Sequence, residues 1–268
     1  MGAGPARLVN HGLGSLSDVR VDQVEVEELA FELGTTFRVL RALAEKVTIA
    51  VQSNHIPLIL AGECLSCVGT LAGLAAESTA IVWLDAHADF NTPETTVSGF
   101  LDGMALATAT GRCWQKLTSS VRGFRPAGER NVVLIGARDL DPEERALLER
   151  SAITSIDTTT IRKRGAKDAL CGPLNSLNAQ QLYLHIDLDV LDLSEARVNQ
   201  FSSTGGLSLA ELLDTVRAVA ATRPVAAAAI TAYDPSYDED GRALRAGTAL
   251  IKELIGSNFA PGPCLSTR

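Results

Sequence analysis

Two short blocks of polar residues carry side chains that can bind metal ions and activate water. Each block directly follows an apolar run, at 79–84 and at 181–186. The candidate ligands are Asp85, His87 and Asp89 in the first block, and Asp187 and Asp189 in the second. In an extended chain, residues two apart point to the same side. Each block therefore presents its ligands on one face at a strand end. Two adjacent ends of this kind suit a pair of hard divalent cations about 3.5–4 Å apart.

Short apolar runs alternate with helical patterns along the chain. Runs rich in Ile, Val, Leu and Ala predict buried strands at 57–61, 79–84, 131–136, 181–186 and 225–231. Helices are predicted at 24–51, 66–76, 141–150, 208–221 and 238–255. The alternation predicts an α/β fold with a parallel sheet and helices on both faces. Ligands of such folds bind beyond the carboxyl ends of the strands, where both polar blocks lie.

Length and composition narrow the class of protein. The 268 residues contain 46% hydrophobic residues and show neither a repeat nor a linker, which favours a single domain over residues 1–268. A net charge of −8 argues against a nucleic-acid or membrane-surface partner. The chain lacks a secretion-signal pattern and a long apolar stretch, so we expect a soluble, cytoplasmic protein. Its five cysteines do not form the pattern of a disulfide scaffold, and Cys113, Cys171 and Cys264 are expected to be plain thiols.

Three motifs make the chain resemble the arginase, or ureohydrolase, family. They are Asp-Ala-His-Ala-Asp-Phe-Asn-Thr-Pro at 85–93, His-Ile-Asp-Leu-Asp at 185–189 and Gly-Ala-Arg-Asp-Leu-Asp-Pro at 136–142. The resemblance spans most of the chain. It implies an arginase-like three-layer α/β sandwich that hydrolyses guanidino groups with two Mn²⁺ ions.

The resemblance also assigns ligands position by position. One metal would be held by the residue at 64 together with Asp85, Asp89 and Asp187. The other would be held by His87, Asp85, Asp187 and Asp189, so that Asp85 and Asp187 bridge. A metal-bridging hydroxide, oriented by Asp89, would then attack the guanidino carbon.

Three further residues match family positions that hold the far end of the substrate. Asn91 and Ser98 correspond to residues that hydrogen-bond an α-carboxylate, and Asp141 corresponds to one that pairs with an α-amino group. This implies a small guanidino amino acid rather than agmatine, which has no carboxylate. The alternative is that Asn91 and Ser98 are turn residues and that Asp141 only begins a helix.

Two departures from the family pattern fall among the metal ligands and the catalytic groups. Cys64 stands in Ala-Gly-Glu-Cys where the family has a histidine ligand, and a thiolate suits Mn²⁺ less well than imidazole. Cys64 either ligates and weakens the metal as an electrophile, or stays a thiol beside a weakly bound metal, or has no metal role. Asp102 replaces a proton-shuttling histidine. It is a poor acid unless burial raises its pKa, and its alternative role is a hydrogen bond to the substrate.

A third departure concerns the guanidinium group of the substrate. Ala232 occupies the position of the family's guanidinium-binding glutamate, so plain arginine should be held poorly. A less basic N-hydroxyguanidine can enter neutral, and its hydroxyl could meet Tyr233 or Asp102. With Cys64 and the Asn-Thr-Pro-Glu-Thr run at 91–95, this pattern resembles the branch of the family that releases hydroxyurea from N-omega-hydroxy-L-arginine in D-cycloserine biosynthesis, an antibiotic pathway.

Two other functions stay open at this point. One is an ordinary arginase or another guanidino hydrolase that releases urea. The other is a catalytically degraded relative that acts as a binding or regulatory subunit. The retention of the five other ligands argues against this second function. Because the family usually forms trimers or hexamers, the resemblance also allows a homo-oligomer.

Overall fold

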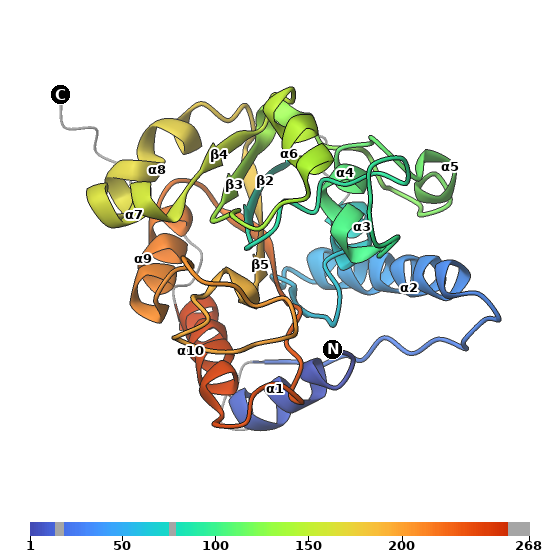
Figure 1. The fold of residues 1–268 in the computed structure, drawn as a ribbon. Helices are drawn as coiled ribbons and strands as arrows, with labels where there is room; N and C mark the ends of the chain where they lie inside the picture. Colours follow the sequence, from blue (N-terminus) through green and yellow to red (C-terminus); the bar gives the residue numbers. More distant parts are fainter. Residues whose placement is uncertain (14–18, 75–78, 257–268) are drawn as a thin grey trace.

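Six parallel strands form one sheet at the centre of the molecule (Figure 1). The computed structural model describes residues 1–13, 19–74 and 79–256. In spatial order the strands are β1 (Leu58–Leu60), β6 (Val225–Thr231), β5 (Gln181–Asp187), β2 (Thr79–Leu84), β3 (Val132–Ile135) and β4 (Thr154–Ile156). Every neighbouring pair runs parallel, so all the carboxyl ends meet at one edge.

Helices cover both faces of the sheet and complete a three-layer, single-domain α/β fold. On one side lie α7 (Thr158–Arg164), α8 (Ala166–Asn175), α9 (Leu209–Ala220) and α10 (Arg242–Gly256), with α1 (Gly4–Gly12) packed beside α10. On the other side lie α2 (Glu32–Gln52), α3 (Ser66–Leu74), α4 (Ala105–Ala109) and α5 (Gln115–Thr118), while α6 (Pro142–Glu149) follows β3. Short 3-10 turns occupy Asp102–Met104, Glu129–Asn131 and Leu188–Val190.

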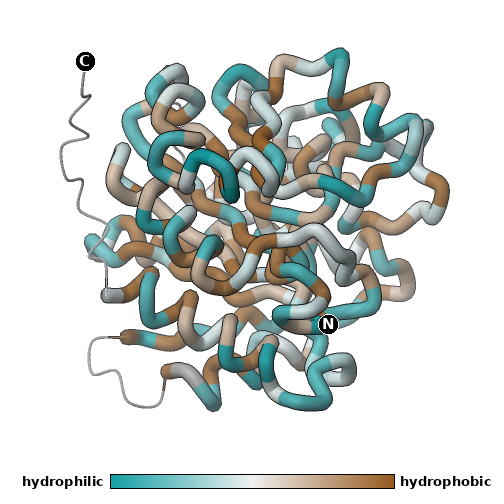
Figure 2. The backbone as a smooth tube through the Cα atoms, turned by 60° about the vertical axis from the view of Figure 1, so that its left-hand side comes forward, coloured by the Kyte–Doolittle hydropathy of each residue, from teal (hydrophilic) through white to brown (hydrophobic). Residues whose placement is uncertain are grey.

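The sheet separates two hydrophobic cores. One core packs Leu170, Val216 and Leu250 of α8, α9 and α10 against one face, and the other packs Phe37 and Val68 of α2 and α3 against the opposite face. Strand β2 is buried along its whole length, which explains its unbroken apolar sequence. In Figure 2 the brown, hydrophobic stretches of the tube run through the interior and teal stretches gather at the periphery.

The strand register brings the two polar blocks together. Leu84 at the end of β2 pairs with Ile186 of β5, and the next residue of β5, Asp187, pairs with Thr231 of β6. Asp85 and Asp187 therefore leave neighbouring strands at the same level. Pairing between β2 and β3, with Leu84 opposite Ile135, places the loop after β3 beside them.

The structure confirms the predicted strands and corrects some boundaries. The predicted helix 24–51 begins only at Glu32; residues 24–31 are neither helix nor strand, and 24–27 alternate valine with glutamate, a period of two rather than the helical 3.6. The edge strand β4, the short helices α1, α4, α5 and α7, and α8 were not predicted. Residues 75–76 of the predicted helix 66–76, and Cys264, lie outside the described residues.

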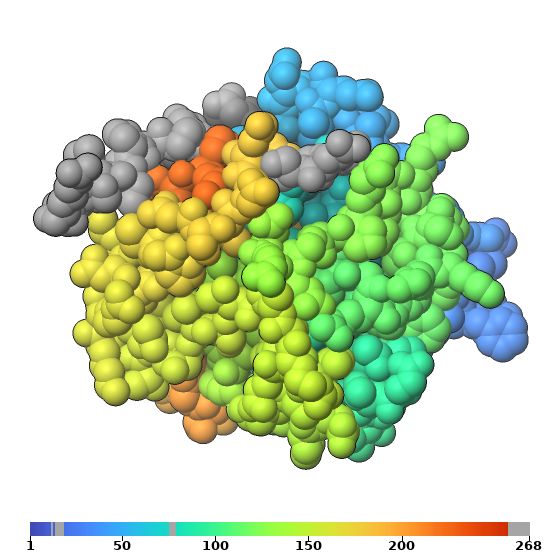
Figure 3. Space-filling view, turned by 90° about the horizontal axis from the view of Figure 1, so that it is seen from above, coloured from blue at the N-terminus to red at the C-terminus, as the bar shows by residue number. Residues whose placement is uncertain are grey.

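Within the described ranges, no helix combines the length and the apolar character needed to cross a membrane. The face seen from above in Figure 3 is formed mainly by the middle of the chain, green to yellow.

Candidate metal centre

Two groups of potential metal ligands lie at the carboxyl ends of the strands. In the first group, one ligand atom each from Cys64, Asp85 and Asp187 lies within 4.8 Å of the others. The second group, with the same spacing, joins Asp85 to His87 and Asp189. Asp85 belongs to both groups, as expected of a carboxylate that bridges two metal ions. Asp187, which was also expected to bridge, belongs only to the first group.

The backbone delivers these side chains from separate strands. Asp85 directly follows β2, Asp187 ends β5, and Cys64 lies in the turn between β1 and α3. Gly136 follows β3 with φ at 96°, and a Cβ at this position would lie 3.0 Å from the Asp85 carbonyl oxygen. Only glycine lets the end of β3 pass so close to the ligand-bearing end of β2.

The His87 imidazole lies between two carboxylates. Its Nδ1 is 3.2 Å from Asp85 Oδ1 and 3.4 Å from Asp189 Oδ2. Burial alone would lower the pKa of His87, but the two carboxylates raise it overall. Burial alone would raise the pKa of Asp189, but the hydrogen bond from His87 outweighs burial and lowers it to about 2. A metal ion bound by this nitrogen would therefore compete with a proton that the two carboxylates stabilise there.

The carboxylates repel one another in the absence of a cation. Burial, followed by the charge of Asp189, raises the pKa of Asp85 to about 6. The same two causes, in the same order, raise the pKa of Asp187. A divalent cation removes this repulsion and favours the ionised carboxylates. Carboxylate oxygens with one imidazole fit a hard divalent ion such as Mn²⁺, whereas the Cys64 thiol is a softer donor.

Asp89 lies beside the two ligand groups but outside both. Its Oδ2 atom is buried and has no hydrogen-bond partner among the described residues. Burial and the charge of Asp85 raise its pKa. Its backbone has φ at 48°, a left-handed conformation that Asp tolerates better than most residues. An unpartnered buried carboxylate oxygen next to the metal ligands fits a residue that holds a cation or a bound water.

Cys64 is tied into a buried hydrogen-bond network. Its Sγ donates to Asp187 Oδ2 at 3.0 Å and lies 3.1 Å from Thr231 Oγ1. Burial, followed by the charge of Asp187, raises the pKa of Cys64, so the metal-free site contains the neutral thiol. Ligation of a metal by this sulfur therefore requires loss of the proton.

The network continues through His185. Its ring is fully buried, is stacked on Trp83 with the centroids 3.6 Å apart, and has a pKa that burial lowers to about 3. The Tyr183 hydroxyl lies 2.8 Å from Nδ1 and Thr231 Oγ1 lies 3.2 Å from Nε2. His185 is thus a neutral core residue that also connects, through Thr231, to Cys64.

Asp102 supports the turn that carries Cys64. Its Oδ1 accepts a hydrogen bond from the Leu65 amide at 3.1 Å, and the Cys64 amide also stabilises the carboxylate. Burial, followed by the charge of Glu63, nevertheless raises the pKa of Asp102 overall. The sequence analysis expected Asp102 to serve as an acid only if burial raised its pKa, and burial does raise it.

The predicted substrate-binding residues are distributed unevenly. Asn91 Nδ2 donates to Asp141 Oδ2 at 3.1 Å, so these two lie together. Ser98 is exposed and accepts a hydrogen bond from the Phe100 amide at 3.1 Å. Tyr233 is buried against the core on the α10 side, and its hydroxyl donates to Asp238 at 3.0 Å. Asn91 and Asp141 are thus in contact with each other, whereas the Tyr233 hydroxyl is hydrogen-bonded to Asp238.

Three residues that position the candidate ligands and their loops were not identified from the sequence. Glu144 Oε1 accepts from the Phe90 amide at 2.9 Å and thereby fastens α6 to the loop after Asp89; burial raises its pKa to about 7. Asn199 Nδ2 donates to Asp189 Oδ2 at 3.3 Å. Arg138 donates to the Asp189 carbonyl at 2.9 Å and to the Ser203 carbonyl at 3.1 Å. Arg138 and Glu144 stand in and next to a recognised motif, whereas no sequence signal marked Asn199.

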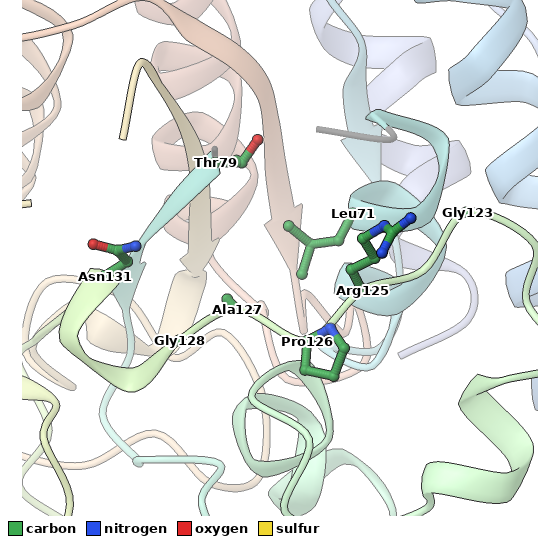
Figure 4. A pocket seen from close by; sticks show the side chains of 8 residues that line it. All are labelled: Leu71, Thr79, Gly123, Arg125, Pro126, Ala127, Gly128 and Asn131. Atoms are coloured by element: carbon green, nitrogen blue, oxygen red, sulfur yellow. The ribbon is translucent and has the colours of Figure 1, made fainter. Parts of the chain in front are cut away.

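A surface hollow lies at the opposite end of the sheet. It measures about 260 Å³ and adjoins the amino ends of β2 and β3 at Thr79 and Asn131, as Figure 4 shows. Its lining residues are Leu71, Thr79, Gly123, Arg125, Pro126, Ala127, Gly128 and Asn131. The lining contains none of the candidate ligands, so this hollow is separate from the metal centre.

This chain is similar, in sequence and in fold, to known arginases. A family model described as "Arginase family" matches residues 3–256. The arginase of Bacillus subtilis (strain 168) is 29% identical over 91% of this chain and 84% of its own length. The arginase of Brevibacillus brevis is 32% identical over 81% of this chain and 74% of its own. The crystal structure of the Bacillus cereus arginase superimposes with a TM-score of 0.84, at 28% identity over 95% of this chain and 92% of that one.

Proposed function

The chain belongs to the arginase family of guanidino hydrolases, and we propose that it converts N-omega-hydroxy-L-arginine and water to L-ornithine and hydroxyurea. The proposed cofactor is a pair of Mn²⁺ ions. The proposed partner is this small guanidino amino acid, with no nucleic acid and no membrane. The setting would be cytoplasmic, with a homo-oligomeric assembly and a role in antibiotic biosynthesis of the D-cycloserine type.

The choice of substrate depends on the alanine at position 232. Its carbonyl accepts a hydrogen bond at 3.0 Å from the Asn199 amide, which also donates to the candidate ligand Asp189. Ala232 is therefore linked through Asn199 to a candidate ligand, and its side chain is a methyl group where the resemblance implies a carboxylate. A permanently charged guanidinium loses its counter-ion there, at a cost of about 3–5 kcal/mol when the pair is buried. A hydroxyguanidine that enters neutral avoids most of that cost.

Each group of residues in the centre has a proposed role in the reaction. Cys64, Asp85, His87, Asp187 and Asp189 would hold the ions, with Asp89 beside them. When bound, the ions would polarise a water molecule and the guanidino group. Asp89 would orient the water through its unpartnered oxygen, and Asp102 would hydrogen-bond the substrate or hold the proton for the leaving amine. Asn91, Ser98 and Asp141 would meet the amino-acid end.

An ordinary arginase activity is the second candidate, because the named relatives at 29% and 32% identity are arginases. The two candidates differ in the product, which is urea from arginine and hydroxyurea from its N-hydroxylated form. A third candidate is a degraded relative without catalytic activity. The clustered candidate ligands argue against it, because a protein without catalysis does not need them.

Three substrates given separately to the Mn²⁺-loaded protein test the proposal. Arginine, N-omega-hydroxy-L-arginine and agmatine would be supplied at equal concentration, with ornithine, putrescine, urea and hydroxyurea quantified by mass spectrometry. The Asp85→Asn variant serves as the matched control, because it removes the carboxylate common to both ligand groups. Metal content is measured on each sample.

The outcomes separate the candidates. At least tenfold faster formation of ornithine from the hydroxylated substrate, and its loss in Asp85→Asn, would support the proposal. Equal or faster turnover of arginine would replace it with an ordinary arginase. No turnover with metal bound would indicate another guanidino substrate, and absence of bound metal would indicate a non-catalytic role.

A further inference from the structure

Two phenylalanine rings from separate loops meet next to the metal centre. Phe100 and Phe201 are stacked, with ring centroids 5.7 Å apart and planes inclined at 28°. Phe201 also meets the candidate ligand His87 edge-on, with centroids 6.2 Å apart and an interplanar angle of 85°. The aromatic pair, defined as Phe100 and Phe201, therefore lies next to a candidate metal ligand, with Phe201 in contact with it.

The aromatic pair is only partly covered by the protein. Phe201 is 37% exposed, and Phe100 is neither buried nor fully exposed. Leaving aromatic surface in water is unfavourable, and it is commonly tolerated where that surface binds something. Their position beside His87, rather than on a remote face, makes a bound substrate the expected occupant.

The loops that carry the rings are fixed to the metal centre. The Phe201 amide donates to Asn199 Oδ1 at 2.8 Å, and the Nδ2 of the same side chain donates to Asp189 Oδ2 and to the Ala232 carbonyl. Arg138 binds the Ser203 carbonyl of the same loop. Phe201 therefore has a defined place relative to the ligands, as a residue that selects substrates requires.

The residues discussed so far do not account for the methylene stem and the flat guanidino face of the substrate. Ala232 offers no carboxylate to the guanidino group, and Asn91 and Asp141 account for polar groups only. Between them an alkylguanidine carries methylene groups and a flat, delocalised guanidino face. Aromatic rings bind both, methylenes by removal from water and a flat cationic or polar group through the ring face.

We propose that Phe100 and Phe201 are specificity-determining residues that bind the methylene stem and the adjacent guanidino face of the substrate. This inference rests on the proposed function and deepens it, because it defines the substrate class as alkylguanidines held by their stem. The protein then selects by stem length, since each methylene that packs on the rings adds about fourfold to affinity.

The test compares N-omega-hydroxy-L-arginine with its homologue one methylene shorter. KM, kcat and binding to the Mn²⁺-loaded protein would be measured for wild type, Phe201→Ala, Phe201→Leu and the double variant of Phe100 and Phe201 to alanine. Phe31→Ala is the matched control, since Phe31 is an 80% exposed phenylalanine that precedes α2. Bound metal is quantified in every protein.

We expect KM to rise about tenfold in Phe201→Ala, with kcat and metal content little changed and Phe31→Ala like wild type. The decisive readout is the ratio of affinities for the two homologues. It should be about fourfold in wild type and close to one in the double variant. Phe201→Leu should keep much of the ratio, because leucine retains an apolar surface. A generally damaged protein would lose affinity for both homologues without changing their ratio.

Two results would overturn parts of this reasoning separately. If wild type turns over the longer substrate but the ratio is the same in wild type and in the double variant, the aromatic pair does not bind the stem and only this inference fails. If wild type binds metal but neither homologue, the proposed function itself fails. Loss of metal in Phe201→Ala and Phe201→Leu alike would show a structural role and would also overturn the inference.

Discussion

Without a bound metal ion, this protein should lose stability as pH rises. Three candidate metal-centre carboxyl groups, Asp85, Asp89 and Asp187, have pKa values above their ordinary range because they are buried close to other negative charges. For Asp85 the value is about 6, against an ordinary 3.8. The difference corresponds to about 3 kcal/mol of unfolding free energy.

The sign follows from where the protons are. Between pH 3.8 and about 6 the folded protein keeps a proton on Asp85 that the unfolded chain has released, so stability is present at low pH and is lost over this window. Asp187 and Asp89 act in the same direction. His87, whose pKa is raised, adds a further loss above its ordinary 6.5. Asp189, with a pKa lowered to about 2, acts in the opposite direction, but only below its ordinary 3.8.

The assay is urea denaturation of EDTA-dialysed protein between pH 4 and 7.5, for wild type and Asp85→Asn. The unfolding free energy of wild type should fall by about 3 kcal/mol more than that of the variant over this range. Adding Mn²⁺ at one hundred times its dissociation constant should restore about 2.7 kcal/mol per site at pH 7.5. Identical pH dependence in the two proteins, or wild-type stability that rises with pH, would refute the electrostatic account of the centre.

Four other substitutions test three separate parts of the structure. Cys64→His should bind Mn²⁺ at least about tenfold more tightly at pH 7.5, because an imidazole nitrogen suits this hard ion better than the buried thiol, which is a softer donor and must lose its proton; weaker binding by calorimetry would contradict this. Ala232→Glu should raise kcat/KM for arginine relative to N-omega-hydroxy-L-arginine by about tenfold or more, and an unchanged ratio in steady-state assays would argue against the missing carboxylate as the selecting feature. Gly73→Ala places a Cβ 2.4 Å from Val47 Cβ between α3 and α2 and should destabilise by about 1–3 kcal/mol in urea, whereas Gly172→Ala, with open space around it in α8, should be neutral or stabilising by up to about 1 kcal/mol.

The sequence by itself determined the fold class and most of the metal-centre chemistry. Strand β2 and the polar block after it are local features: a buried apolar run followed by ligands two residues apart. Parallel strands end at a common edge, so Asp85 and Asp187 were predictable neighbours without coordinates. The missing carboxylate at Ala232 and the thiol at Cys64 were likewise visible as departures from the family pattern.

The sequence missed elements whose local signal was weak or was overridden. Segment 24–31 contains good helix formers, yet 24–27 alternate valine with glutamate, and helix α2 begins only at Glu32. Strand β4 at Thr154–Ile156 is short and half-buried at the edge, so it lacks the apolar run that marked the central strands.

Only the tertiary structure decided how distant loops complete the centre. Asn199 links Asp189 to Ala232, Arg138 ties the loop after β5 to the loop after β3, and Phe100 meets Phe201 across two loops. No periodicity encodes such contacts, because loop residues are placed by chain closure and by the packing of the elements they connect. The ligand types and their strand ends are therefore written locally in the chain, whereas the surroundings that set their charge and select a substrate arise from contacts between segments far apart in sequence.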